Sequence, residues 1–313
     1  MRENFIACLD AVLPIFVLIL VGYVSKRIGL LNRGDVRKMN KVFFRVFMPV
    51  MLFYSIYSSD LSSAVQPALI AYALGCTLLV FFLSLALVVR VEPVRKRRGV
   101  IIQGLFRSNL VVIGLPVVES LMGNEQLGPV VLLIATVVPL FNVLAVIILE
   151  FYGGEHTRLS HLFLDILKNP LILGSLAGLL FLALGIRIPL PLETAARQMS
   201  QAASPVLLFL LGAFLQPEGL VHDLKAVLWV SFGRLVLVPA LTLLPAVLLG
   251  WRGVALASLL PVFASSTAVN SFTMAQQMGG DAELAGNIVV ATSALCSLTM
   301  FFWCFLFKSL GMI

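Results

Sequence analysis

Ten apolar stretches follow one another along the chain, and each is long enough to form a helix that crosses a membrane. They fall at about residues 8–28, 39–58, 67–89, 99–121, 128–150, 168–186, 198–216, 224–250, 253–277 and 283–308. A helical crossing needs about 20 apolar residues. The stretches are continuous, whereas the strands of a membrane β-barrel alternate polar and apolar residues. The pattern therefore predicts an all-α polytopic membrane protein with ten transmembrane helices.

The chain resembles itself when it is shifted by 156 residues, about half its length. Proline, glycine and methionine coincide at six positions: Pro14, Gly22, Gly29, Pro49, Met122 and Gly123 fall on Pro170, Gly178, Gly185, Pro205, Met278 and Gly279. Proline and glycine mark places where the backbone departs from a plain helix, so these matches are informative. Each half holds five predicted helices, and an odd number places the second copy upside down. We predict two inverted five-helix repeats, residues 1–152 and 168–313, joined by a short cytoplasmic linker, 153–167.

The fourth and ninth predicted helices occupy equivalent places in the two halves and are the least regular. Both carry proline and several polar residues in the middle of an apolar stretch. Free backbone groups are costly in lipid, so such breaks occur where they line a cavity or are buried in protein. Paired breaks indicate a transport site, although serine and threonine can also bond back to their own helix and tighten packing. We assign Gly114, Pro116 and Pro261 as the helix-breaking residues.

Composition and charge agree with a membrane location and orient the chain. Hydrophobic residues make up 60% and charged residues 12%, against about 25% charged in soluble domains, which excludes a soluble enzyme. The net charge is +7. Fourteen basic residues lie in loops on one side: Lys26, Arg27, Arg33, Arg37, Lys38, Lys41, Arg90, Arg95, Lys96, Arg97, Arg98, Arg158, Lys168 and Lys225. Five lie on the other: Arg2, Arg187, Arg197, Arg252 and Lys308. Because basic loops stay in the cytoplasm, both termini are expected on the periplasmic or extracellular side of the inner membrane. The lipid bilayer, rather than nucleic acid, is the expected partner.

Four segments carry a resemblance to a known family. They are RSNLVVIGLPVVESLMG (107–123), TAVNSFTMAQQMGGDAEL (267–284), NKVFFRVFMPVMLF (40–53) and KNPLILGSLAGLL (168–180). In this order and spacing the chain resembles the auxin efflux carrier family, which includes the plant PIN-formed transporters and bacterial malonate and malate permeases. Asn109, Gly114 and Pro116 match the fourth helix of that family. Ser108 and Ser266 stand where plant members have the proline of the crossover.

The resemblance implies an architecture and a mechanism. The broken fourth and ninth helices would cross; helices 1, 2, 6 and 7 would form a scaffold, and helices 3–5 and 8–10 a mobile transport domain. Substrate would bind beside the crossover and be carried by an elevator-like movement. The family also implies a homodimer. Plant members have a long loop between helices five and six, which here shrinks to about residues 153–167.

Polar residues near the predicted breaks are the candidates for substrate binding. The amino ends of half-helices present free N–H groups and a positive dipole end, which suits a carboxylate. Asn109 and Asn270 can donate amide hydrogens without the cost of burying a charge. The further candidates are Arg107, Ser108, Ser266, Thr267 and Asn142. Arg107 either clamps the anion or extends toward the cytoplasmic side. Arg45 and Arg234 are expected to pair between helices or to reach the interface.

These features predict a secondary transporter of a small organic anion, such as malonate, malate or an auxin-like acid. The three histidines lie in predicted loops and the chain has no phosphate-binding loop, so we expect no enzyme, no cofactor and no metal site. A proton or a sodium ion as the coupling ion is left open. Two alternatives remain: a cation-coupled symporter of a neutral or bile-acid-like solute, and a non-transporting membrane receptor. Sodium dependence would favour the first, and binding without flux the second.

Overall fold

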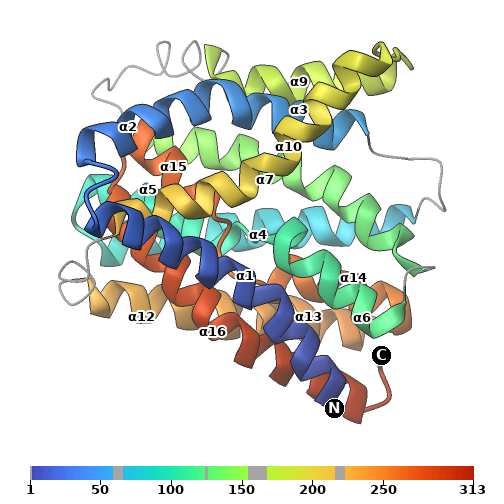
Figure 1. Ribbon diagram of the computed structural model, residues 1–313. Coiled ribbons are helices and arrows are strands. Elements are labelled where there is room, and N and C mark those ends of the chain that lie inside the picture. Colours follow the sequence, from blue (N-terminus) through green and yellow to red (C-terminus); the bar gives the residue numbers. More distant parts are fainter. Residues whose placement is uncertain (1, 59–65, 124–125, 154–167, 216–222) are drawn as a thin grey trace.

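The computed structural model describes residues 2–58, 66–123, 126–153, 168–215 and 223–313, and these form helices almost throughout (Figure 1). Within these ranges the β-structure is one isolated bridge. The α-helices are α1 (Arg2–Arg27), α2 (Arg33–Val42), α3 (Met48–Tyr57), α4 (Pro67–Val91), α5 (Arg95–Phe106), α6 (Leu115–Met122), α7 (Gly128–Gly153), α9 (Pro170–Ala183), α10 (Leu190–Phe214), α12 (Leu224–Phe232), α13 (Val238–Leu248), α14 (Gly253–Ala264), α15 (Asn270–Gln277) and α16 (Ala282–Ser309). Three π-helical segments, η1 (Phe43–Phe47), η2 (Leu110–Gly114) and η4 (Gly233–Leu237), join α2 to α3, precede α6 and join α12 to α13.

Five continuous helices in the described chain are long and apolar enough to cross a membrane. They are Arg33–Tyr57, Pro67–Val91, Gly128–Gly153, Leu224–Leu248 and Ala282–Ser309. Large apolar side chains on their outer faces are exposed, including Phe82 on α4 and Phe302 on α16. Such an exposed apolar surface requires lipid rather than water around it. The prediction of a helical, multi-pass membrane protein is therefore confirmed.

Two helices begin earlier than their apolar stretches. The second predicted span starts at Arg33 instead of residue 39, and the seventh at Leu190 instead of residue 198. Asn32 caps the first of these in a capping box with Asp35, which holds a polar first turn in helical form. The early start of α10 follows Pro189 and has Glu193 in its first turn. A count of apolar residues does not detect such polar helical turns, because they lie outside the apolar stretch.

Contacts between connecting segments indicate that successive spans run in alternating directions. At one end lie the hydrogen bonds from Lys26 Nζ to Leu215 O (3.4 Å), from Arg95 Nη2 to Phe151 O (2.6 Å), from Arg97 Nη2 to Asp223 Oδ1 (2.8 Å) and from Asp281 N to Lys96 O (3.3 Å). At the other end, Ile188 N donates to Tyr57 Oη (3.3 Å) and Gly253 N to Met312 O (2.8 Å). The two termini lie near each other in Figure 1. The first end carries the predicted cytoplasmic basic loops.

The most extensive helix contacts form two groups, which also touch where α1 packs against α16 and α6. In the first, α1 packs against α10 and α3 packs against α9 and α10. Glycines allow close contact there: a Cβ at Gly212 would meet the backbone of Ile19, and one at Gly178 would lie 2.8 Å from Phe53 O. In the second group, α5 packs against α4 and α7, and α16 against α12, α14 and α15. The first group is therefore held by direct contact between helix backbones.

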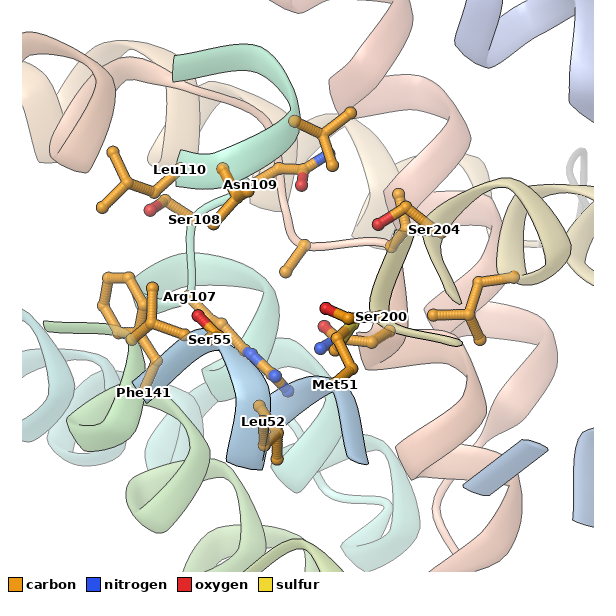
Figure 2. Close-up of a pocket in the computed structure, with 17 residues that line it drawn as sticks. Met51, Leu52, Ser55, Arg107, Ser108, Asn109, Leu110, Phe141, Ser200 and Ser204 are labelled. Atoms are coloured by element: carbon orange, nitrogen blue, oxygen red, sulfur yellow. The ribbon is translucent and has the colours of Figure 1, made fainter. Parts of the chain in front are cut away.

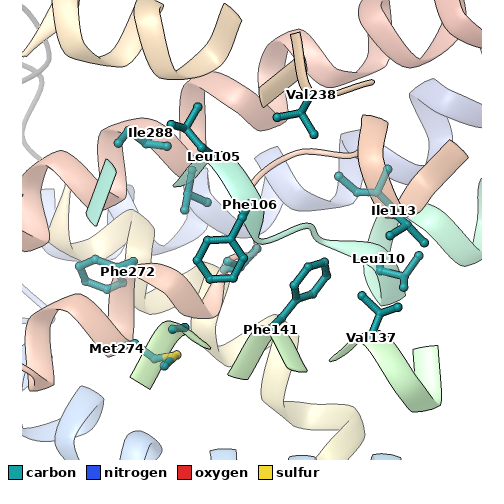
Figure 3. Close-up of a cluster of buried hydrophobic side chains, with 14 of the residues drawn as sticks. Leu105, Phe106, Leu110, Ile113, Val137, Phe141, Val238, Phe272, Met274 and Ile288 are labelled. Carbon is teal, nitrogen blue, oxygen red and sulfur yellow. The ribbon is translucent and has the colours of Figure 1, made fainter. Parts of the chain in front are cut away.

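Aromatic side chains form the centre of the second group. The ring of Phe106 meets Phe81 edge to face with centroids 5.2 Å apart, and Phe141 lies 6.0 Å away on its other side. Figure 3 shows Phe106 and Phe141 beside Leu105, Leu110 and Ile113, where α5 gives way to η2. Edge-to-face aromatic pairs add to the energy of burial. This cluster therefore packs beside the place at which the fourth span breaks.

Each π-helical segment is followed by a proline. Pro49, Pro116 and Pro239 are the second residues of α3, α6 and α13, which begin directly after η1, η2 and η4. Proline has no N–H to donate to the carbonyl one turn earlier, so a regular α-helix is interrupted at this point. A wider π-turn accommodates the interruption without ending the helix. These prolines therefore reshape the helices and do not end them.

Elements of the two halves correspond at the spacing of 156 residues. Adding 156 to the bounds of α7 gives residues 284 and 309, and α16 spans Ala282–Ser309. Gly29 and Gly185 both have positive φ angles, 80° and 64°, and so do Gly123 and Gly279, 82° and 75°. A positive φ is the conformation in which glycine is favoured over other residues. The coinciding glycines thus have the same backbone role in each half.

Candidate functional site

Two extended segments cross in the middle of the molecule. The chain leaves α5 at Phe106 and α14 at Ala264, and Ser108 pairs with Thr267 in an antiparallel bridge. Asn109 N donates to Ser266 O (2.8 Å), and Ala268 N donates to Arg107 O (3.3 Å). Each segment thus satisfies backbone groups of the other, as apolar surroundings require. Ser108 and Ser266 thus lie at a crossing that has no proline and is held by hydrogen bonds between the two backbones.

The breaks lie elsewhere than at Gly114, Pro116 and Pro261. The observed breaks are at residues 107–109 and 265–269, whereas Gly114 ends η2, Pro116 belongs to the first turn of α6 and Pro261 lies inside α14. Gly114 packs on Pro261, since a Cβ at Gly114 would lie 2.6 Å from Pro261 Cβ. Gly114 and Pro261 therefore pack the two broken spans together. Proline composition misplaced the breaks because backbone pairing, not proline, determines where each helix ends.

A cavity of about 140 Å³ lies between the crossing and the helices α3, α7 and α10. Figure 2 shows Ser200 and Ser204 of α10 across the pocket from Ser108 and Asn109. The lining residues are Met51, Leu52, Ser55, Arg107, Ser108, Asn109, Leu110, Val111, Val112, Val138, Phe141, Ser200, Ser204, Leu207, Ala268, Val269 and Asn270. Apolar walls with a few converging polar groups are typical of a small-molecule site. The cavity is also smaller than the roughly 300–1,000 Å³ of sites for drug-sized ligands.

Arg107 places a buried positive charge at this cavity. Its side chain is 2% exposed, Nη2 donates to Asn142 Oδ1, and Nη1 lies 2.6 Å from Met274 Sδ. Both partners are neutral, and no carboxylate of the described residues forms an ion pair with Arg107. The guanidinium therefore does not extend to the cytoplasmic interface. A buried cation with neutral partners favours binding of an anion beside it.

Further hydrogen-bond donors face the same cavity. The side chain of Asn109 is buried, and its Nδ2 has no partner within the described chain. The N–H groups of Leu110, Val111 and Val112, at the start of η2, also have no acceptor among the described residues. All four residues line the cavity. Free N–H groups and the positive end of a helix dipole form a common binding arrangement for anions.

The residues predicted from sequence divide into two sets. Arg107, Ser108, Asn109 and Asn270 line the cavity. The other three lie behind it and hold its wall: Thr267 Oγ1 donates to Gly104 O (2.8 Å), Ser266 Oγ accepts from Ser293 Oγ (3.3 Å), and Asn142 accepts from Arg107. The structure thus brings all seven to the crossing, and four of them line the cavity.

Sequence reasoning missed the serines of the opposite wall. Ser55 lies on α3, and Ser200 and Ser204 lie on α10. A signal was present, since Ser204 precedes Pro205, which matches Pro49 of α3 in the repeat. Serine in an apolar helix is nevertheless common, because its hydroxyl can bond back to the helix. Ser200 and Ser204 differ from other serines only in lying on the side of α10 that faces the crossing.

Two further cavities open at the basic end of the molecule. One of about 240 Å³ is lined by Lys26, Arg33, Val36, Arg37, Ala213, Phe214 and Glu283. The other, of about 370 Å³, is lined by Arg37, Lys41, Phe214, Gln276, Gln277, Gly280 and Ala282. Arg37 and Phe214 belong to both, so the cavities adjoin. Several basic side chains there raise the local concentration of anions.

Broken helices that cross inside an apolar helical molecule, beside a cavity with apolar walls and a few polar groups, are typical of membrane transporters. The chain belongs to the membrane transport protein family, the auxin efflux carrier family: the family model matches residues 7–161 and 155–304. It is similar to an "Uncharacterized transporter" of Methanothermobacter thermautotrophicus, 24% identical over 96% of this chain and 98% of that protein. A second "Uncharacterized transporter", of Methanocaldococcus jannaschii, is 23% identical over 94% and 97%. A "Putative malonate transporter" of Rhizobium meliloti is 26% identical over 92% of each chain. The protein is thus a membrane transporter by family.

Proposed function

We propose that the protein carries a small organic anion, a mono- or dicarboxylate, across the inner membrane. The observation that carries this proposal is Arg107, a buried cation whose described partners are neutral and which lines the central cavity. A carboxylate in the cavity would supply the missing negative charge. The free Nδ2 of Asn109 and the amino end of η2 would donate to the same carboxylate. Positive charge and free donors together favour an anion over a neutral solute.

The cavity favours a small acid with a short apolar body. Its volume is about 140 Å³, and Val111, Val138, Phe141 and Leu207 form its apolar walls. The name of the Rhizobium relative suggests malonate, a three-carbon dicarboxylate. A dicarboxylate would place its second carboxylate near Ser200 and Ser204, whose hydroxyls can donate hydrogen bonds. Malonate and malate are accordingly the first substrates to test, with auxin-like aromatic acids as larger probes.

The mechanism we propose is alternating access by an elevator movement. The first group of helices, α1, α2, α3, α9 and α10, would be the scaffold, and the remaining helices the transport domain. The extensive packing of α1 on α10 and of α3 on α9 supports this division, and α1 also contacts α16 and α6 across it. The correspondence of α7 with α16, and of the paired glycines, supports two inverted five-helix repeats. Two inverted copies can form two conformations of similar energy, open to opposite sides. We also propose that both termini lie outside the cytoplasm and that the protein forms a homodimer.

A flux assay tests the function. The purified protein is reconstituted in liposomes, and uptake of radiolabelled malonate, malate, acetate and an auxin-like acid is measured. We expect saturable uptake of at least one carboxylate, and its loss in Asn109→Ala, while Gly75→Ala on the outer face of α4, with open space around it, transports normally. Absence of flux for every anion by folded protein would reject the proposal. Binding without flux would instead indicate a receptor.

A further inference from the structure

Arg234 is the second buried arginine of the membrane interior, and substrate binding does not use it. It lies in η4, between α12 and α13, and its side chain is 0% exposed. It does not line the central cavity. Among the described residues, no carboxylate forms an ion pair with it. Its charge must therefore be balanced by something other than an acidic side chain, because an unbalanced buried charge is very costly.

The balance comes from the carboxyl ends of both broken helices. Arg234 Nη1 donates to Leu105 O (3.1 Å) and Phe106 O (3.4 Å) at the end of α5. Its Nη2 donates to Val262 O (3.1 Å) and its Nε to Ser265 O (2.9 Å) at the end of α14. Each nitrogen of the guanidinium thus has an acceptor. The last carbonyls of a helix lack partners within it and form the negative end of its dipole.

These contacts account for the whole carboxyl end of α5. Of its last four carbonyls, Gln103 O accepts from Arg107 N (3.1 Å) and Gly104 O from Thr267 Oγ1 (2.8 Å). The remaining two, Leu105 O and Phe106 O, accept from Arg234. Arg234 therefore occupies the point where the negative ends of two half-helices converge. In secondary transporters, unwound carbonyls and half-helix carboxyl ends of this kind coordinate a coupling Na⁺.

We propose that Arg234 is a resident cation of the crossover, which takes the place of a coupling sodium ion, so that transport proceeds without sodium. This inference rests on the proposed transport function. A tethered guanidinium neutralises the converging carbonyls permanently, whereas a free ion would do so only when bound. The planar fork of arginine also matches four carbonyls from two helices, which a lysine ammonium with three donors cannot satisfy. The coupling ion left open by the sequence would accordingly not be sodium at this site.

The first test needs no variant. Carboxylate flux into proteoliposomes is measured in sodium chloride and in N-methylglucamine chloride of equal ionic strength. Equal initial rates are expected, and a requirement for sodium would overturn the proposal. If wild-type protein shows no flux of any anion in either salt, the proposed function fails, and the second test still decides the role of Arg234.

The second test is chemical rescue of a truncated side chain, followed by thermal unfolding in detergent. Arg234→Ala should unfold at a lower temperature than wild type, and millimolar guanidinium chloride should restore much of the loss, whereas sodium chloride at the same concentration should restore less. Its flux should fall about tenfold or more and recover with guanidinium. Arg45→Ala, at an exposed arginine of another π-helical segment, η1, is the control. Unfolding of Arg234→Ala at the wild-type temperature, or no response to guanidinium, would overturn the proposal.

Arg234→Lys protects the test against a variant that does not fold. It keeps the charge but has three donors for four carbonyls. We expect a folded protein with a smaller fall in unfolding temperature than the alanine variant, and sodium-independent flux. A lysine variant that becomes sodium-dependent would contradict the view that any fixed cation at this point replaces the ion. A wild-type unfolding temperature in this variant would contradict the proposed match between the guanidinium fork and the four carbonyls.

Discussion

At the scale of single residues, two arginines buried in the same apolar interior have opposite environments. The guanidinium of Arg234 meets backbone carbonyls at each of its nitrogens, whereas Arg107 meets one amide oxygen and a thioether and lines the cavity. A thioether is a weak acceptor. The donors of Arg107 are therefore available to an anion, whereas those of Arg234 are already bound to backbone carbonyls. This difference separates Arg107, which is proposed to bind the anion, from Arg234, which holds the backbone of the crossing.

The first prediction concerns Arg107→Gln. We expect the KM for the transported anion to rise about ten- to a hundredfold, because charge-assisted hydrogen bonds contribute about 1.5–3 kcal/mol. The unfolding temperature without substrate should stay the same or rise, since the variant removes an uncompensated buried charge. Flux kinetics and thermal unfolding measure the two effects, with Arg45→Gln as the matched exposed control. A wild-type KM, or a collapse of stability without change in KM, would assign Arg107 a structural role.

Residue type and spacing alone are enough to select Arg107, Ser108, Asn109 and Asn270, which line the central cavity, because polar residues in an apolar stretch are conspicuous. The same reasoning could not separate Thr267 and Asn142, which support the site, from residues that line it. Nor could it select Ser200 and Ser204 from other serines. Packing between elements far apart in sequence determines which side of a helix faces a cavity. The local sequence does not contain this information.

At the scale of elements, two extended segments replace helix at the centre of the fold. Their backbones pair through Asn109 N and Ala268 N, and side chains complete the pairing where the backbone cannot. Thr267 is the clearest case: its hydroxyl donates to Gly104 O, and its own N–H donates to Thr292 Oγ1 at 3.2 Å. A buried polar group without a partner is costly in an apolar interior. The crossing therefore depends on a few hydroxyls as much as on its backbone bonds.

The second prediction follows for Thr267→Val, which keeps the shape and removes the hydroxyl. Gly104 O then loses its donor, and we expect the free energy of unfolding to fall by about 1–3 kcal/mol. Urea or thermal unfolding in detergent measures the change. Thr299→Val is the control, because the hydroxyl of Thr299 donates to Leu295 O within its own helix (3.2 Å). Equal effects of the two substitutions would show that the contact across the crossing has no special weight.

At the scale of the whole molecule, apolar periodicity predicted the helical membrane class and the approximate places of the long helices. It could not predict the division into two packed groups, because that division depends on contacts between helices. Close backbone contact, permitted by glycines such as Gly212 and Gly178, holds the first group. Aromatic packing around Phe106 holds the second. Polar contacts join the groups: Thr273 Oγ1 of α15 donates to Asn40 Oδ1 of α2 (2.7 Å), and Asn40 Nδ2 donates to Gln276.

The contact between Asn40 and Thr273 lies between the proposed scaffold and transport domain, so an elevator movement must break it. The third prediction is made in a chain whose native cysteines are replaced. A short thiol cross-linker between Asn40→Cys and Thr273→Cys should stop flux, and reduction should restore it. The control pair is Gly99→Cys with Tyr152→Cys, within the transport domain, because a Cβ at Gly99 would lie 3.4 Å from Tyr152 Cβ, close to the roughly 3.5–4.5 Å of a disulfide. That cross-link should leave flux unchanged, since α5 and α7 both belong to the proposed transport domain. Full flux with the first pair cross-linked would show that the two groups do not move apart at α2 and α15, and a rocking movement about this contact would then replace the elevator.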